Sequence, residues 1–484
     1  MKILGNKMKK TLYFLLLTSF AAPVYASDEV MGIQTNFTSP NGLIERCVRI
    51  TPVPGGTYSD GDLEDEAEYC SIDLYVDAVA LCPKTWSTSP GMEVYDISEG
   101  NYANNREEFQ RNACAEGKSA RDLAADVWFK FKPTMNQSGT SGTFSTSSLL
   151  YYHFSRYFDA TVNVPVAVWR SMDAAEHLRE VALSGQTLSG GNQGGRMNHE
   201  GWRALVAADQ LPASYSPTDE LFTADRTQIY GVAVNSPGHR YGPSINGTRT
   251  SGWGKGQNRD FQETPAFLAL RSNSALEDAI AEGLAVGREV HVINKDLGPN
   301  VPPQQMVYWM KELTEIVLFD FIFSQQDRVG NIDFTPYYYW LEDGELTHEK
   351  AKHHEMGDGS MPEDAILIRR TNLNDNDAGG RVQYANFSKS TQMLEKLRHF
   401  GGDTYQRLMA LDADLQNEGV VFQWVSTSFG LDDRQIAQIV NNTSLAAEIL
   451  RSTCEAGDLI FDLSPRHYFE TGDATPQQIN CDGS

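Results

Sequence analysis

Residues 318–332 read Leu-Phe-Asp-Phe-Ile-Phe-Ser-Gln-Gln-Asp-Arg-Val-Gly-Asn-Ile, and the rest of the chain is organised around them. The stretch begins as the end of a helix, because apolar residues recur at three- and four-residue steps: Met306, Met310, Leu313, Val317 and Phe321. The pattern breaks at residues 324–326, and the aromatic run at 337–341 then predicts a strand. Asp327 and Asn331 are therefore expected on a tight loop between a buried helix and a strand.

The residue types on this loop point to phosphate chemistry. Kinases place a catalytic aspartate and, a few residues later, a metal-binding asparagine on such a loop. Asp377-Ala-Gly379 supplies a second acid, followed by a glycine that frees the backbone to turn. Because Mg²⁺ is usually held by one or two carboxylates plus substrate phosphate, one Asp and one Asn suffice. The pattern predicts Asn331 and Asp377 as ligands of Mg²⁺ or Mn²⁺.

The segment from Phe319 to Asn331 resembles the catalytic segment of the secretory-pathway kinases. That family includes the Golgi casein kinase (family with sequence similarity 20) and four-jointed. More distantly, the segment is similar to the Asp-Arg-His loop of phosphoinositide kinases. Residues 127–133, Val-Trp-Phe-Lys-Phe-Lys-Pro, resemble the family's lysine-bearing strand, and residues 150–158 and 164–168 resemble the helix and strand that follow. The resemblance covers residues 121–465 in patches.

The resemblance implies an α+β, two-lobed fold like that of an atypical protein kinase. The N-lobe, with a mixed β-sheet and insertions, would cover residues 121–290. A mainly helical C-lobe and a disulfide-bearing tail would cover residues 291–484. The implied cofactors are ATP or another nucleoside triphosphate and a divalent metal ion.

The resemblance also implies roles for single residues. Asp327 would accept or orient the acceptor's proton, and Arg328 beside it would brace the catalytic loop. Lys132 would hold the nucleotide phosphates, because it precedes Pro133 as in the family. Lys130 shares a strand face with Lys132 and is a second candidate for this task. The alternative is that both lysines only decorate an exposed strand face.

The chain departs from the family pattern at several positions. Ser148 stands where the family helix carries a glutamate that pairs with the lysine, and Val329 replaces the histidine after Asp-Arg. Asp327 and Asp377 lie further apart than in the family, which implies an insertion such as residues 347–362.

An active site would need another carboxylate beside Lys132, since a lone buried lysine loses stability or its charge. The nearest acids after it in sequence are Asp159, Asp173, Glu176 and Glu180. We expect Glu176 or Glu180 to take this place, because the predicted helix at 172–183 can return over the sheet towards the cleft.

Residues 1–26 have the features of a secretory signal peptide. Residues 2–10 are basic, residues 12–22 are apolar, and residues 24–26 end in a small-residue cleavage pattern. The apolar run is too short for a permanent membrane anchor. The mature protein is therefore expected to start near Ser27 and to be exported, to a bacterial periplasm or to the medium.

The six cysteines agree with export. An even number in an exported chain predicts disulfides, and the spacings fit no compact zinc site. Cys454 and Cys481 both lie in the C-terminal tail, so we expect them to pair. Cys47, Cys70, Cys82 and Cys114 would then pair among themselves. Residues 27–120 are expected to form an irregular extension packed on the core.

The net charge of −24 disfavours nucleic acid or an anionic membrane as a partner. Two charged clusters offer metal alternatives. The acidic run at 60–66 could bind calcium, although a solvated loop is the commoner interpretation. A histidine-rich group could bind zinc, but it lacks the spacing of a zinc-protease motif and a polar loop is favoured. That group consists of His348, Glu349, His353, His354 and Glu355.

Further elements follow from apolar spacing and turn residues. Residues 228–234 predict a strand, and the glycine-rich residues 240–259 predict a long surface loop. Helices are predicted at 276–286, 393–400, 405–415, 434–440 and 445–454.

The predicted function is that of an exported atypical kinase. It would transfer a phosphoryl group from a nucleotide to a hydroxyl of a protein or a small molecule. The missing glutamate at Ser148, and the scarcity of ATP in a periplasm, favour instead a pseudokinase with a binding or regulatory role. A nucleotidyl transferase on the same fold is a further alternative. A serine hydrolase has no support, because the sequence contains no Gly-x-Ser-x-Gly elbow.

Overall fold

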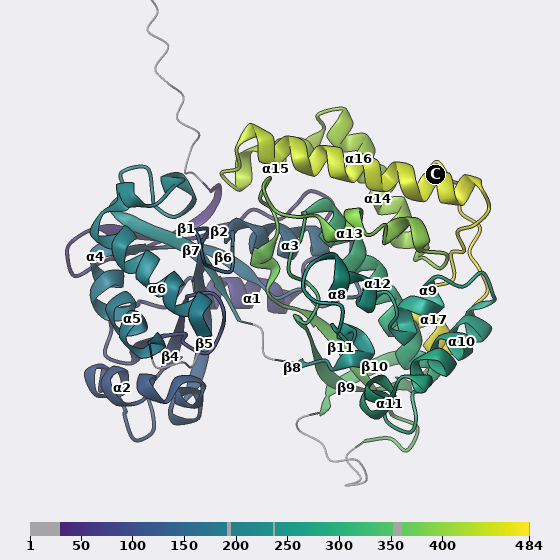
Figure 1. The fold of residues 1–484 in the computed structure, drawn as a ribbon, viewed down its shortest axis with the longest axis horizontal. Helices are drawn as coiled ribbons and strands as arrows, with labels where there is room; N and C mark the ends of the chain where they lie inside the picture. The colour runs from purple at the N-terminus through teal and green to yellow at the C-terminus, as the bar shows by residue number, and fades with distance from the viewer. Residues whose placement is uncertain (1–29, 191–194, 236–237, 352–360, 484) are drawn as a thin grey trace, which may run out of the picture.

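The computed structural model describes residues 30–190, 195–235, 238–351 and 361–483. The chain forms an α+β protein with a seven-stranded sheet and a four-stranded sheet, which confirms the predicted fold class at that level. The two sheets lie in different halves of the molecule (Figure 1). In the part of the chain that the structure describes, no helix is both long and apolar enough to cross a membrane. The predicted signal peptide lies outside the described residues.

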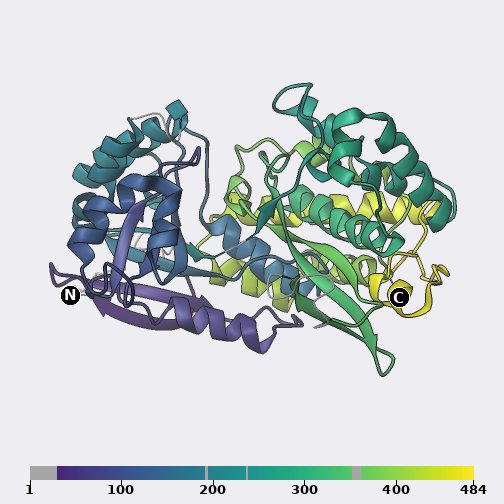
Figure 2. The same cartoon turned by 90° about the horizontal axis from the view of Figure 1, so that it is seen from below.

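The seven-stranded sheet is antiparallel at every pairing. Its spatial order is β1 (Gly32–Thr38), β2 (Ile44–Ile50), β6 (Ala167–Asp173), β7 (Gln228–Val234), β5 (Asp126–Pro133), β4 (Met92–Asp96) and β3 (Val79–Pro83). Strands from the first hundred residues thus form both edges of the sheet, and Figure 2 shows them in the same half as the later strands. The prediction that residues 27–120 form an irregular appendage is therefore wrong. The early strands form two local hairpins, β1–β2 and β3–β4, and each hairpin joins the sheet by pairing with a later strand, β6 or β5.

The smaller sheet lies in the helical half. Its strands are β10 (Glu345–Lys350), β9 (Ile332–Glu342) and β11 (Ile366–Leu373), and β8 (His239–Arg240) pairs with the start of β9. The hairpin of β9 and β10 occupies part of the insertion predicted at 347–362. His348 stacks on Tyr339 with ring centroids 4.9 Å apart. His353, His354 and Glu355 lie outside the described residues.

Helices cover the sheets and form most of the second half of the molecule. In the first half they are α1 (Asp60–Tyr69), α2 (Arg106–Asn112), α3 (Thr146–Tyr157), α4 (Ala174–His177), α5 (Leu183–Ser189) and α6 (Gly195–Gln210). The second half contains α7 (Pro243–Asn246), α8 (Lys255–Phe261), α9 (Pro265–Leu270), α10 (Leu276–Glu289), α11 (His291–Leu297), α12 (Pro303–Ile322), α13 (Phe387–Ser390), α14 (Gly402–Gln416), α15 (Val420–Ser428), α16 (Asp433–Glu455) and α17 (Pro465–Thr471). The predicted loop at 240–259 thus contains one short helix and the start of another.

Of the helices predicted near the C-terminus, two are confirmed but joined into one, and one is wrong. Residues 434–440 and 445–454 belong to one helix, α16, because the intervening Asn442 is buried and donates to the Ile322 carbonyl oxygen and Ser324 Oγ. Residues 393–400 form only a 3-10 turn at Leu394–Lys396. The backbone N–H groups of residues 398 and 400 bond to Leu270 and Ile460, so these amides are lost to the helix.

The acidic run at 60–66 is neither a calcium loop nor a solvated loop. It forms the start of α1, which Ser59 caps by accepting a hydrogen bond from the Asp62 backbone N–H. Asp62 pairs with Arg156 at 2.6 Å, and the buried Glu66 accepts a hydrogen bond from Tyr152 at 2.8 Å. These acids therefore fasten α1 to α3.

α12 is buried on every side and forms the core of the helical half. From the sequence we predicted that one face of this helix is buried. Its complete burial is tolerated because the charged residues of α12 have partners. Glu312 pairs with Arg370, and Asp320 pairs with Arg328. The carboxylate of Glu315 accepts from the backbone N–H groups of residues 161 and 162. Buried charges that are paired in this way anchor α12 to the loops that surround the site.

Three disulfides join Cys47 to Cys70, Cys82 to Cys114 and Cys454 to Cys481. This confirms the predicted C-terminal pair and the pairing of the four N-terminal cysteines among themselves. The second disulfide ties the end of β3 to the 3-10 helix at Cys114–Leu123. In a chain-entropy model, closing loops of this size contributes about 3 kcal/mol each to stability.

Candidate functional site

A cleft of about 590 Å³ is lined by residues of both sheets. Among them are seven basic side chains: Lys84, Lys118, Arg121, Lys130, Lys132, Arg240 and Arg249. Four acids line it too: Asp327, Asp333, Asp375 and Asp377. Basic side chains thus outnumber acidic ones in the cleft, although the whole chain has a net charge of −24. It brings together five of the six predicted site residues, namely Lys130, Lys132, Asp327, Asn331 and Asp377.

Lys132 lies on β5 and is only 6% exposed. Its Nζ donates to Asp377 Oδ1 at 2.8 Å and to Asp375 Oδ1 at 3.1 Å. Burial by itself would lower the pKa of Lys132, but the two carboxylates outweigh it and raise the pKa above its ordinary value. The expected carboxylate beside this lysine therefore exists, and it comes from the segment after β11.

Glu176 and Glu180, the expected partners of Lys132, lie elsewhere. Glu176 binds Arg179 and Asn41, and Glu180 binds Arg106 at 3.0 Å. Their helical segment packs on β3 and α6, so both acids find their partners there instead of in the cleft. That expectation is wrong. Ser148, at the position of the family's glutamate, does line the cleft.

Asp377 is held in a 3-10 helix at Asn376–Ala378. The glycine that follows, Gly379, does not make the turn that we predicted, because its φ of −125° is accessible to any residue. The positive φ of 75° belongs to Gly380. Gly379 is restricted by space, since a Cβ there would lie 3.0 Å from Ser147 Oγ and 3.1 Å from the Phe323 carbonyl oxygen. This close approach locks the Asp377 segment to the end of α12.

Asp327 stands at the rim of the cleft, on the loop after α12. Its Oδ1 accepts from Trp253 Nε1 at 3.3 Å, and Asn331 Nδ2 donates to its carbonyl oxygen at 2.7 Å. Burial raises the pKa of Asp327 to about 6, helped by the negative charge of Asp375 and opposed by the hydrogen bond from Trp253. Asp327 is therefore a stronger base than an ordinary aspartate and is ionised at neutral pH.

Arg328, the next residue, points away from the cleft. Its guanidinium is buried and forms a two-bond ion pair with Asp320, with N–O distances of 3.0 Å. It also donates to the Asn374 carbonyl oxygen at 2.6 Å and to Asn376 Oδ1 at 2.9 Å. Arg328 thus joins the end of α12 to the loop that carries Asp377. It does not line the cleft, so its catalytic assignment is corrected to that of a positioning residue, which agrees with the predicted bracing role.

The residues fit a divalent cation only in part as predicted. Among the described residues, no group of three or more His, Cys, Asp or Glu gathers as a metal cluster. Asn331 Oδ1 is already engaged by Arg240 Nη1 at 2.5 Å. Asn374 Oδ1, by contrast, is buried and has no hydrogen-bond partner in the described chain. Because Mg²⁺ and Mn²⁺ prefer oxygen and need few protein ligands, Asp377 with Asn374 is the better-suited donor set.

Sequence reasoning missed several residues of the cleft. Lys84 and Trp86 belong to the turn at 84–91 between β3 and β4, and Arg240 and Trp253 belong to the predicted surface loop. The signal for the turn was present. Residues 79–82 are a short apolar run, residues 92–97 alternate apolar and acidic residues with one aromatic, and a Ser/Thr/Pro-rich stretch separates the two, which is typical of a hairpin.

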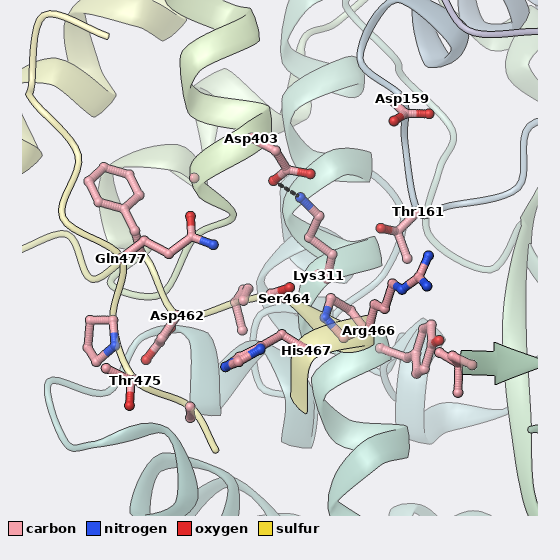
Figure 3. Close-up of a pocket in the computed structure, with 18 of the residues that line it drawn as sticks. Asp159, Thr161, Lys311, Asp403, Asp462, Ser464, Arg466, His467, Thr475 and Gln477 are labelled. Atoms are coloured by element: carbon pink, nitrogen blue, oxygen red, sulfur yellow. Dashed lines mark hydrogen bonds and ion pairs between the residues drawn. The ribbon is translucent and has the colours of Figure 1, made fainter. Parts of the chain in front are cut away.

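A second pocket, of about 760 Å³, lies between α12, α14, α17 and the β9–β10 hairpin (Figure 3). None of the predicted site residues lines it. Lys311 Nζ contacts Asp403 Oδ1 and Thr404 Oγ1, each at 2.6 Å, and Arg370 Nε contacts Glu312 Oε1 at 2.8 Å. These cations already have protein partners, so the pocket offers no open charge to a ligand from either of them.

A scan of the chain against models of known protein families found no match, and a search of curated proteins found none either.

Proposed function

We propose that the protein is an exported atypical kinase, which transfers a phosphoryl group from a nucleoside triphosphate to a hydroxyl acceptor with the help of a divalent metal ion. The observation that carries this proposal is the convergence of Lys132, Asp327 and Asp377 on one cleft. The three residues were selected from separate stretches of sequence by their resemblance to kinase motifs. A Lys132–Asp377 contact across 245 positions of sequence is not expected of unrelated surface residues.

The order of the elements supports the same function. In protein kinases a loop covers the nucleotide phosphates, and the phosphate-binding lysine lies on a nearby strand. Here the turn at 84–91 lines the cleft, and Lys132 lies on β5, the strand next to β4 in the sheet. The turn lacks the Gly-x-Gly-x-x-Gly pattern and offers Ser87, Thr88 and Ser89.

In the proposed reaction Asp327 takes the proton of the acceptor hydroxyl. The acceptor oxygen forms a bond to the terminal phosphorus, and the bond from that phosphorus to the bridging oxygen breaks with its electron pair on the nucleoside diphosphate. A pKa of about 6 keeps Asp327 ionised at neutral pH and makes it a better proton acceptor than an ordinary aspartate. A divalent ion, held by Asp377 and Asn374, would neutralise phosphate charge. Arg328 keeps Asp327 and Asp377 at a fixed separation.

A pseudokinase is the second candidate, and one observation favours it. Both Asp375 and Asp377 contact Lys132, so the charge of this lysine is already neutralised by protein, and Ser148 supplies no replacement carboxylate. A kinase of this type would have to release at least one of these contacts when the nucleotide and metal bind.

Two measurements test the proposal. Thermal unfolding with ATP, with and without Mg²⁺ or Mn²⁺, should show metal-enhanced stabilisation. Incubation with ATP labelled at the γ- or α-phosphorus, in the presence of candidate protein and small hydroxyl acceptors, should transfer only the γ label. Transfer of the α label would indicate a nucleotidyl transferase, and binding without transfer a pseudokinase. If the protein binds no nucleotide under any of these conditions, all three functions (kinase, nucleotidyl transferase and nucleotide-binding pseudokinase) are contradicted.

A further inference from the structure

Lys84 and Lys130 lie near Lys132 in the cleft and differ from it because, among the described residues, neither ammonium has a hydrogen-bonded or ion-paired partner. Lys84 follows β3 directly, and Lys130 lies on β5 two residues before Lys132, with Glu93 of β4 opposite it in the sheet register. Both lysines line the cleft. Lys84 is only 8% exposed, so its ammonium reaches solvent through the cleft.

Neither ammonium forms a hydrogen bond or an ion pair within the described residues, whereas Lys132 forms two. The acid opposite Lys130 is already committed, because Glu93 pairs with Arg121 and accepts a hydrogen bond from Tyr95 at 2.6 Å. Burial lowers the pKa of Lys84, and the like charge of Lys132 lowers it further. The same two causes, burial and then the charge of Lys84, lower the pKa of Lys130 to about 8.

Lys84 is buried, Lys130 is half-buried, and within the described residues neither ammonium is hydrogen-bonded or ion-paired to a carboxylate. Two such neighbouring cations are unfavourable in the free protein, because burial removes their hydration and they repel each other. A bound anion relieves both penalties. A single carboxylate can neutralise only one of the two ammonium groups, whereas a chain of phosphates presents several charges in a row. Thr88 and Ser89 follow Lys84 in the same turn and also line the cleft, and their hydroxyl groups can donate to phosphate oxygens, whereas the Ser87 hydroxyl donates to the Ser89 carbonyl oxygen.

We propose that Lys84 and Lys130 form an anion subsite that binds the outer phosphates of a polyphosphate-bearing ligand, separately from the Lys132–Asp377 pair. This assignment rests on the proposed function where the ligand is a nucleoside triphosphate, but the subsite can be measured with inorganic phosphates alone. It shifts the phosphate-binding role from Lys132, which is neutralised, to the two lysines that are not.

The test uses calorimetric titration of the full exported chain with tripolyphosphate, pyrophosphate and inorganic phosphate, without metal. We expect tripolyphosphate to bind more tightly than phosphate, and Lys84→Met or Lys130→Met to weaken it by about tenfold or more, the usual effect of losing one charged hydrogen bond. Lys295→Met is the matched control, since this exposed lysine of α11 does not line the cleft. The Lys295→Met variant should bind tripolyphosphate with the affinity of the wild type.

Stability separates a binding role from a structural one. Lys84→Met removes an unpaired buried charge, so its thermal unfolding temperature without ligand should equal or exceed that of the wild type. A structural lysine would instead give a less stable variant. An unstable Lys84→Met variant, or unchanged tripolyphosphate affinity in both lysine variants, would overturn the subsite even if ATP binds.

The pH dependence of binding provides an independent readout. Lys130 faces Lys84, Glu93, Arg121 and Asp375, and burial together with the charge of Lys84 lowers the pKa of Lys130 to about 8. Tripolyphosphate affinity should therefore fall as the pH rises through about 8, and Lys130→Met should remove that decline. Tripolyphosphate binding that depends on Lys84, in a wild-type protein that binds no ATP, would uphold the subsite and contradict the nucleotide proposal. A wild type that does not bind tripolyphosphate would overturn the subsite.

Discussion

The cleft and the second pocket are both lined by lysines, arginines and aspartates, but their charges are arranged differently. In the second pocket Lys311 and Arg370 are fixed by carboxylates of α12 and α14. In the cleft Lys84 and Lys130 have no partner among the described residues, and Asp327 holds a raised pKa. An unpaired buried charge costs free energy that only a ligand can recover. A substitution in the cleft should therefore change activity, and one in the second pocket should change stability.

The largest expected effect is that of Asp327→Asn. Loss of a general base typically lowers the rate by about 10²- to 10⁴-fold, so γ-phosphoryl transfer should fall by that factor. The folded protein should be as stable as the wild type at neutral pH or more so, because a carboxylate whose pKa is raised by folding destabilises the fold when ionised. Transfer assays with labelled ATP and denaturant unfolding measure the two quantities.

A matched control for this variant is Asp364→Asn, at an exposed position before β11. It should alter neither quantity. If Asp327→Asn unfolds, or retains full transfer activity, the assignment of Asp327 as the base is wrong. In a pseudokinase the same substitution would leave nucleotide or partner binding unchanged.

Glu312→Ala should show the opposite behaviour, because it breaks the structural network beside the second pocket. Glu312 is fully buried and accepts hydrogen bonds from Arg370 and from the backbone N–H and side chain of Thr371. Removing one partner of such a pair typically costs about 3–5 kcal/mol of unfolding free energy. Denaturant unfolding at neutral pH measures the loss.

The exposed Glu345 of β10 provides the comparison, since Glu345→Ala should change stability by less than about 0.5 kcal/mol. Nucleotide affinity of folded Glu312→Ala should be close to that of the wild type. A stable Glu312→Ala variant with impaired phosphate binding would reverse the roles that we assign to the two pockets.

The pH profile of transfer should report Asp327. The base must be ionised, so kcat/KM should fall about tenfold for each pH unit below the pKa of Asp327, which is about 6. Above that pH, kcat/KM should no longer change with pH through Asp327. Rates measured from acidic to neutral pH, at constant ionic strength, define the limb. An acidic limb that begins near pH 4, as for an ordinary aspartate, would contradict a raised pKa at the cleft rim.

The smallest effect is expected for Trp253→Phe. The indole N–H donates to Asp327 Oδ1 at 3.3 Å, and this contact favours the ionised carboxylate. Its loss should move the acidic limb of the profile to higher pH while leaving the rate at neutral pH close to that of the wild type. An acidic limb at the same pH in both proteins would show that Trp253 does not affect the ionisation of Asp327.

The sequence predicted those features that depend on local order. The spacing of apolar residues located α12, the resemblance of residues 127–133 to a lysine-bearing strand located β5, and a short apolar stretch located β7. The break after Phe321 located the loop of Asp327 and Asn331. The grouping of cysteines along the chain predicted that the four N-terminal cysteines pair among themselves and that the two C-terminal ones pair with each other. Each of these follows from residues that are neighbours in sequence.

The partners of charged side chains were decided by the tertiary structure alone. Lys132 meets Asp375 and Asp377 across more than 240 positions, while Glu176 and Glu180, which we expected beside it, bind arginines elsewhere. Lys84 enters the cleft only because β4 pairs with β5 and brings the β3–β4 hairpin beside it. Local patterns fix which backbone segments form, because backbone hydrogen bonds and side-chain spacing are short-range. Which charges become neutralised, and which stay open to a ligand, depends on contacts that only the folded chain creates.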